Sequence, residues 1–455
     1  MKHKNNSFKN KVDNYFKISE HGSSFKVEII AGIATFLAMA YILGVNPALL
    51  SEGGMPATGV FFATALASGI SCIIMGLISK YPVGLAPGMG IIPVFTYTII
   101  ISMGNTWETA LAAVFVSSIL FILITISGLR EAILNAIPLD LKFAIGAGIG
   151  FFLAFVGLKG AGIIIGNSST LVGMGNISSA PALLAIIGIM LTLVLYLKKV
   201  PAAVFLGLVI TSILGVIFTL FGFGTGNALM PSIPTHFISF NFDVSLVCAF
   251  TKGFSQLFSN IPNLLTILFS LLFVTFFDTT GTLIPLANQC GFIDEDGNAD
   301  GIGRAFLADA ISGLIGAVLG TSTLNAYVES ATGIGLGGRT GLTAIFIGIF
   351  FLLSLVFAPT VLSLFTSSVT AAALVIVGIL MAAQLKEVDW NNMVMASSVF
   401  ITTIMMILTY SITIGISWGF ITYAVASIAT GKAKEFKLVT WLLITVFTVS
   451  LFLGL

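Results

Sequence analysis

Long apolar runs alternate with short polar segments along almost the whole chain. Seven runs fill each half, at residues 27–50, 58–79, 83–102, 107–128, 142–163, 181–197 and 201–221, and then at 264–286, 305–320, 322–338, 340–358, 367–384, 391–410 and 412–430. Most of them approach the roughly twenty apolar residues that a helix needs to cross a bilayer. The pattern therefore predicts an all-α polytopic membrane protein with about 14 transmembrane spans.

Two further stretches lie outside these series. Residues 231–262 form a more polar, amphipathic stretch between the two halves. A last apolar run, residues 437–455, is compatible with an extra crossing or with a helix that lies along the membrane.

Composition supports lipid as the main solvent of this chain. Only 8% of its 455 residues are charged, and the mean hydropathy is +1.10. A soluble domain is about a quarter charged, because water must wet its surface. The net charge of +1 gives no reason to expect a nucleic-acid partner.

The metal-binding residue types are few and scattered. Cysteines occur only at positions 72, 248 and 290, and histidines only at 3, 21 and 236, outside the apolar runs. This spacing does not match a disulfide framework or a metal site. We therefore expect no metal and no cofactor. The chain also shows no nucleophile–histidine pairing and no P-loop, so we expect a transporter driven by an ion gradient and not an enzyme.

The basic residues predict the orientation in the membrane. Residues 1–26 form a lysine-rich polar tail that reads as a cytoplasmic leader, without the features of a cleaved signal peptide. With this tail inside, the cytoplasmic loops receive Lys80, Arg130, Lys142, Lys198, Lys199, Arg304, Arg339, Lys386, Lys432 and Lys434. Basic residues favour the cytoplasmic side. We expect a multi-pass protein of the cell (inner) membrane with its N-terminus in the cytoplasm.

The third run of each half is interrupted by glycine, proline and small polar residues. These interruptions lie at residues 81–90 and 320–341, about half a chain apart. Because seven spans is an odd number, the second half enters the membrane from the opposite side. Paired interruptions in inverted halves point to the substrate site of a transporter. Glycines also allow close helix packing, which is the role expected for Gly146, Gly148 and Gly150.

Three carboxylates lie within the apolar runs, where ionisable groups are costly and indicate function. Asp278 follows a dozen apolar residues in the eighth run, and Glu329 lies at the entry to the second interruption. A buried carboxylate tends to take up a proton, which could couple proton flux to solute flux. Asp309 follows Arg304 near the expected cytoplasmic surface, so a capping or pairing role is favoured there.

Four motifs together resemble a known transporter family. They are Thr35-Phe-Leu-Ala-Met-Ala-Tyr-Ile-Leu-Gly-Val-Asn-Pro47, Ala86-Pro-Gly-Met-Gly90, Phe277-Asp-Thr-Thr-Gly-Thr282, and Glu329-Ser-Ala-Thr-Gly with Gly337-Gly-Arg-Thr-Gly-Leu-Thr343. In this order and spacing the chain resembles the AzgA-like purine permeases of the nucleobase–cation symporter superfamily. The resemblance spans nearly the whole chain.

The resemblance implies a fold of two inverted repeats of seven spans, divided into a core and a gate domain. The core would comprise residues 27–128 and 263–358. The gate would comprise residues 129–262, which include a linker, and 359–455. By analogy, the core carries a purine base (hypoxanthine, guanine or adenine) with a proton, by an elevator-like movement against the gate. A homodimer formed through the gate is a further implication.

The same resemblance assigns the binding residues. The acids of the family fall on Asp278 and Glu329, which would bind the base and couple the proton. Contacts from the third span fall on Gly88, Met89, Gly90 and Ile92, and Ser330 joins them beside Glu329. The family usually has asparagine where this chain has Ile92, and often threonine where it has Ala38. The loss of one hydrogen bond to a polar substrate costs about 1–3 kcal/mol if its partner stays unsatisfied.

Two other functions remain open from the sequence. An anion transporter could be built on the same fold, although two acids in the site count against it. A transport-degenerate membrane protein that binds a ligand without moving it is the second alternative, because Ile92 departs from the family pattern.

Overall fold

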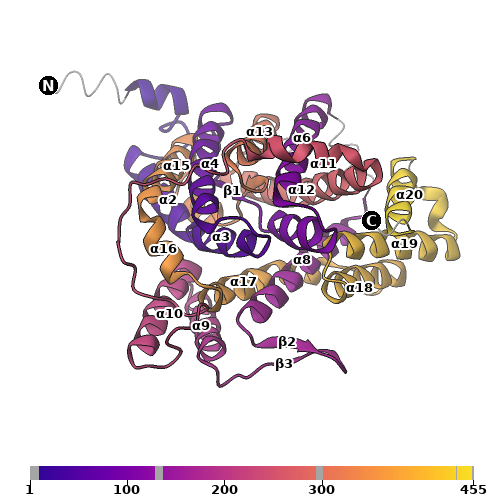
Figure 1. The fold of residues 1–455 in the computed structure, drawn as a ribbon. Coiled ribbons are helices and arrows are strands. Elements are labelled where there is room, and N and C mark those ends of the chain that lie inside the picture. The colour runs from indigo at the N-terminus through magenta and orange to yellow at the C-terminus, as the bar shows by residue number, and fades with distance from the viewer. Residues whose placement is uncertain (1–9, 129–136, 294–300, 437, 453–455) are drawn as a thin grey trace.

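The computed structural model describes residues 10–128, 137–293, 301–436 and 438–452, and helices dominate it (Figure 1). Eleven helical segments of this described part are long and apolar enough to cross a membrane. Two interrupted segments and the shorter helix α18 (Met393–Leu408) bring the crossing elements to fourteen. The predicted class and number of spans are confirmed.

The first half contains α2 (Phe25–Met39), α3 (Ile42–Glu52), α4 (Ala57–Ile78), β1 (Leu85–Pro87), α5 (Ile91–Pro93), the π-helix η1 (Val94–Ser102), α6 (Trp107–Ser127), α8 (Leu139–Gly160), β2 (Ile164–Asn167), β3 (Leu171–Met174), α9 (Ala180–Leu197) and α10 (Ala203–Leu220). The helices α2 and α3 together make the first crossing. The segment β1–α5–η1 is the interrupted third crossing.

The second half begins with η2 (Ala249–Gly253) and α11 (Phe254–Ser259). It continues through α12 (Ile261–Cys290), α13 (Ile302–Leu319), β4 (Leu324–Ala326), α14 (Ser330–Gly335), α15 (Gly341–Ser354), η3 (Leu355–Phe357), α16 (Ala358–Leu364), α17 (Ser367–Ala382), η4 (Ala383–Glu387), α18, α19 (Ile412–Ala429), η5 (Lys432–Glu435) and α20 (Leu438–Phe452). Here β4–α14 is the interrupted crossing.

Polar side chains set the start of several spans. Ser24, Asn260 and Ser411 accept hydrogen bonds from backbone N–H groups in the first turns of α2, α12 and α19. Thr106 does the same for α6. Such caps satisfy N–H groups that have no partner within the helix, so the polar residues between the apolar runs fix the helix ends.

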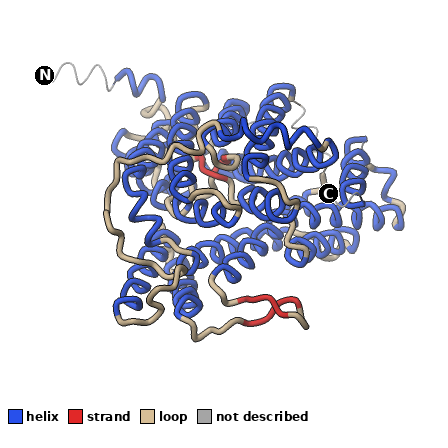
Figure 2. The backbone as a smooth tube through the Cα atoms, viewed as in Figure 1, coloured by secondary structure: helices blue, strands red, loops and turns tan. Residues whose placement is uncertain are grey.

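The helices pack as two groups. One group contains α2, α4, α6, α12, α13 and α15 around the short strands β1 and β4, and the other contains α8, α9, α10, α17, α18 and α19. The first group lies above the second in Figure 1, and Figure 2 shows the β1–β4 pair in red among the helices of the first. This division follows the expected core and gate segments, which remain a proposal as functional domains.

Close packing in the second group depends on glycine, as the sequence predicted. A Cβ added to Gly150 of α8 would lie 2.7 Å from the Gly378 backbone oxygen of α17. A Cβ added to Gly378 would lie 2.5 Å from the Gly150 oxygen. The two backbones therefore touch, and any larger residue would force the helices apart.

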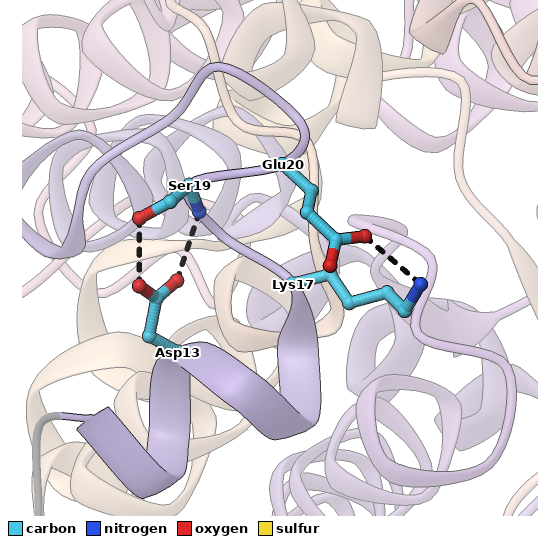
Figure 3. A network of polar contacts seen from close by, with 4 residues as sticks. All are labelled: Asp13, Lys17, Ser19 and Glu20. Atoms are coloured by element: carbon cyan, nitrogen blue, oxygen red, sulfur yellow. Dashed lines mark hydrogen bonds and ion pairs between the residues drawn. The ribbon is translucent and has the colours of Figure 1, made fainter.

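The part of the N-terminal tail that the structure describes is held by local polar contacts. The Asp13 carboxylate accepts the Ser19 backbone N–H at 2.8 Å and the Ser19 hydroxyl at 2.6 Å, and Lys17 pairs with Glu20 at 2.9 Å (Figure 3). Residues 1–9 and Arg130 lie outside the described part. The contacts are exposed, so they contribute little to stability.

Three connecting elements complete the description. The amphipathic stretch 231–262 is irregular chain and turns as far as residue 248 and then forms η2 and α11. The strands β2 and β3 form an antiparallel hairpin that the hydropathy pattern did not predict (Figure 2). The helix α20 packs on α19 through Phe420 and Phe447, whose ring centroids are 4.8 Å apart.

Candidate functional site

The two interrupted segments meet in the first helix group. The strand β1 pairs antiparallel with β4, and Leu85, Ala86 and Pro87 lie opposite Ala326, Asn325 and Leu324. The pairing closes their backbone hydrogen bonds inside the protein, which non-helical chain at membrane depth requires. The sequence predicted that these segments correspond, and the structure brings them into direct contact.

Asp278 lies beside this strand pair, on α12. Its Oδ2 accepts a hydrogen bond from Asn325 Nδ2 at 2.8 Å, and a Cβ built on Gly90 would lie 3.7 Å from the same oxygen. The side chain is only partly buried. The Asn325 Oδ1 atom is buried and has no hydrogen-bond partner among the described residues. The pair thus offers one carboxylate and one free amide oxygen, both acceptors of N–H groups.

Gly88 leaves no room for a side chain at this point. A Cβ built on it would lie 2.9 Å from Asn325 Nδ2 and 3.0 Å from Asp278 Oδ2. The Gly88 N–H donates to the Thr323 carbonyl oxygen at 2.9 Å. The backbone of the third crossing therefore approaches Asp278 and Asn325 directly.

Glu329 lies just before α14 and contacts the first crossing. The Tyr41 hydroxyl donates to Glu329 Oε1 at 2.7 Å. Tyr327, two residues earlier, donates its hydroxyl to the Pro87 carbonyl oxygen at 2.6 Å. Asp278 is close enough to Glu329 for the two carboxylates to repel each other when both are charged. The structure thus brings the two predicted acids into one electrostatic site.

Asp309 supports this site from α13 and is only 1% exposed. Its Oδ2 accepts the Thr279 hydroxyl at 2.7 Å, and its Oδ1 accepts the Ala326 backbone N–H at 2.9 Å. Thr279 adjoins Asp278, and Ala326 adjoins Asn325. The surface position expected for Asp309 is therefore wrong, because this face of α13 packs against α12 and β4.

Glu28 is a fully buried acid that the sequence analysis did not single out. Its carboxylate accepts backbone N–H groups from Arg339, Thr340 and Thr343, as well as the Thr343 hydroxyl. It therefore caps the first turn of α15, where the N–H groups and the helix dipole favour a negative charge. This role is structural and links α2 to α15.

The remaining predicted site residues occupy three different environments. Ser330 Oγ is fully buried and accepts the Gly84 N–H at 3.0 Å, so it joins the two interrupted segments. Ile92 is fully buried in the main apolar cluster, on the short helix α5. Met89, between the two site glycines, is 7% exposed. Direct contact of these side chains with a substrate stays a prediction.

Two groups of site residues were missed from the sequence. Asn325 was not singled out, although an amide in an interrupted apolar segment is itself a signal of a polar site. Tyr41 and Tyr327 looked like ordinary aromatic residues of a span. Their hydroxyl partners come from other crossings, and hydropathy does not reveal such pairings.

Comparison with known proteins agrees with this architecture. The model of the Permease family, for xanthine/uracil-type permeases, matches residues 26–418. The chain is 45% identical to the guanine/hypoxanthine permease PbuG of Bacillus subtilis, covering 95% of this chain and 98% of that protein. It is 37% identical to the adenine permease AdeQ of Escherichia coli, covering 96% and 95%.

Solved structures show the same fold at low sequence identity. The transmembrane domain of the cyanobacterial bicarbonate transporter BicA aligns with a TM-score of 0.62 and 15% identity, covering 86% of this chain and 96% of that chain. Fourteen crossing elements, two interrupted segments that meet, and a family match over most of the length agree with one another. The chain belongs to the Permease family and is a membrane transport protein, not an enzyme.

Proposed function

We propose that this permease imports a purine base (hypoxanthine, guanine or adenine) together with a proton. The observation that carries the proposal is the pairing of Asp278 with Asn325 beside the Glu329–Tyr41 pair, at the crossing of β1 and β4. Adjacent N–H groups of a flat heterocycle match the carboxylate and amide oxygens of this site. Relatives named for guanine, hypoxanthine and adenine support the substrate class.

Proton coupling follows from the position of the two acids. Asp278 and Glu329 are partly buried carboxylates within the membrane-crossing helix group. A carboxylate away from water favours its neutral form, and neutralisation of one acid relieves its repulsion of the other. Binding of the base and binding of the proton are thereby linked at one site.

The two helix groups suggest how the site moves. The core group would carry β1, β4 and the acids past the gate group of α8–α10 and α17–α19, in an elevator-like movement. We place the N-terminus in the cytoplasm and the protein in the inner membrane, on the distribution of basic residues. A homodimer through the gate group completes the proposal.

A second candidate is an anion transporter, favoured by the shared fold with BicA. Two carboxylates in the site oppose it, because they repel an anion. Uptake of radiolabelled hypoxanthine, guanine, adenine and bicarbonate by cells that lack their own purine permeases distinguishes the two. We expect saturable uptake of at least one base. Bicarbonate uptake alone would establish the second candidate, and base binding without uptake would indicate a protein that no longer transports.

A further inference from the structure

A polar cavity of about 410 Å³ lies at the N-terminal end of α12. Residues of η1, α12 and α19 form most of its wall, and its polar lining consists of Thr98, Ser102, Asn260, Asn263, Thr266, Ser411 and Thr413. None of the described residues that line it is charged. Its size falls within the range of small-molecule sites in proteins.

The wall of this cavity is partly fixed by its own hydrogen bonds. Asn105 Nδ2 donates to the Ile99 carbonyl oxygen at 3.0 Å, which leaves Asn105 Oδ1 to accept Asn263 Nδ2 at 3.1 Å. These bonds fix the orientation of the Asn263 amide. Thr98 and Ser102 come from η1, a nine-residue π-helix. Helices of this kind are rare and often mark functional sites.

A stripe on α12 leads from this cavity to the acidic site. Thr266, Ser270, Val274 and Asp278 follow one another at intervals of four residues. Each is therefore a surface neighbour of the next, and together they form a row that winds slowly around the helix. At one end, Thr266 lines the cavity. Near the other, a Cβ built on Gly90 would lie 3.4 Å from Val274 and 3.7 Å from Asp278 Oδ2.

The stripe is closed between its two ends. The Thr413 hydroxyl of α19 donates to Ser270 Oγ at 2.9 Å, and Ser270 is 4% exposed. Val274 is fully buried one turn further along. A hydrogen bond between the two helix groups and one apolar side chain thus separate the cavity from Asp278.

We propose that the cavity is a second binding site for the transported base, occupied before the base reaches Asp278. This inference rests on the proposed function. Hydroxyl and amide groups both donate and accept hydrogen bonds, so they suit the edges of a neutral heterocycle. An ion would lose its hydration there without a counter-charge. Opening the Ser270–Thr413 bond, together with movement of the Val274 side chain, would connect the two sites along the stripe.

Cysteine protection tests this proposal. The background protein carries Cys248→Ser, which removes the exposed native cysteine among the described residues. Ser102→Cys is added to it, and the protein is treated with a membrane-impermeant thiol reagent from outside. At a hypoxanthine concentration about ten times the dissociation constant of the cavity, occupancy by the base should slow the labelling of the cysteine at position 102 about tenfold. We expect similar protection when Asp278→Asn is added, because the cavity does not contain Asp278.

Two further variants make the test specific. Thr98→Val combined with Asn263→Leu should abolish the protection although Asp278 is intact. Asn227→Cys, in a separate cavity of about 510 Å³ between α10 and α16, should be labelled at the same rate with or without hypoxanthine. Protection that disappears with Asp278→Asn, or that survives the double substitution, would overturn the second site. Absence of purine uptake by the wild type would instead contradict the proposed function.

Discussion

Asn325 donates a 2.8 Å hydrogen bond to Asp278, and this bond joins the second interrupted crossing to α12. The two residues are 47 positions apart in the chain. Asp309 accepts hydrogen bonds from Thr279 and Ala326, which are the chain neighbours of Asp278 and Asn325. The position of the proposed base-binding carboxylate is therefore set by contacts between three crossings. Changes at any of these contacts should alter binding without removing the carboxylate itself.

Asn325→Ala should weaken hypoxanthine binding. It removes a hydrogen bond to a carboxylate and the amide oxygen that we assign to the base. A loss of about 1–3 kcal/mol corresponds to roughly 5- to 150-fold in the dissociation constant. Calorimetric titration of the purified protein measures it. Asn391→Ala, in an exposed turn, is the matched control. An unchanged dissociation constant for Asn325→Ala would exclude Asn325 from the site.

Gly88→Ala should reduce purine uptake although the new side chain is only a methyl group. That methyl would meet Asn325 Nδ2 at 2.9 Å and Asp278 Oδ2 at 3.0 Å, so one of them must move. Gly281→Ala is the control, since a Cβ there has open space within 4 Å. Uptake in permease-deficient cells, normalised to the amount of protein in the membrane, compares the two. Equal uptake by both variants would show that the close approach at Gly88 is unimportant.

Ile92→Asn should change the preference among bases. The substitution restores the residue usual in the family at a buried position next to the Gly88–Gly90 backbone. An added amide that reaches the base should improve binding of some bases by about 1–3 kcal/mol, and others less. Competition of unlabelled hypoxanthine, guanine, adenine and xanthine against one labelled base measures the change. If every base competes as it does with the wild type, position 92 does not contact the substrate.

Glu28→Ala should destabilise the protein. The buried carboxylate accepts three backbone N–H groups at the start of α15, and hydrogen bonds to a charged group contribute about 1.5–3 kcal/mol each. We expect a clear fall in the melting temperature of the detergent-solubilised protein. Glu20→Ala, which removes only the exposed pair with Lys17 (Figure 3), should leave it almost unchanged. Equal melting temperatures for the two variants would contradict the capping role of Glu28.

Local patterns in the sequence were sufficient to predict the spans and both interruptions. Runs of apolar residues and their Gly- and Pro-rich breaks can be recognised within a short window of the sequence. In lipid, an apolar run of this length must form a helix, because its backbone polar groups have no water to bind. Asp278 and Glu329 are also identifiable from local sequence, because a carboxylate within an apolar run is unusual. Their role in binding stays a prediction.

What the sequence could not show are contacts between distant segments. Asp309 was placed near the surface from its distance to Arg304 along the chain, whereas its true partners, Thr279 and Ala326, lie on other elements. Glu28 caps a helix that begins more than 300 residues later, as its bond to Thr343 shows. The pairing of β1 with β4 is of the same kind. Such contacts depend on how the two halves interleave, and hydropathy carries no information on that.

Hypoxanthine accumulation in proteoliposomes, driven by an inward proton gradient, tests the central claim most directly. The protein with Asp278 should accumulate the base, and a protonophore should abolish the accumulation. Asp278→Asn, which keeps the shape of the side chain but cannot carry the proton, should not accumulate the base at all. Accumulation by Asp278→Asn at the wild-type rate would contradict the assignment of base and proton to this residue.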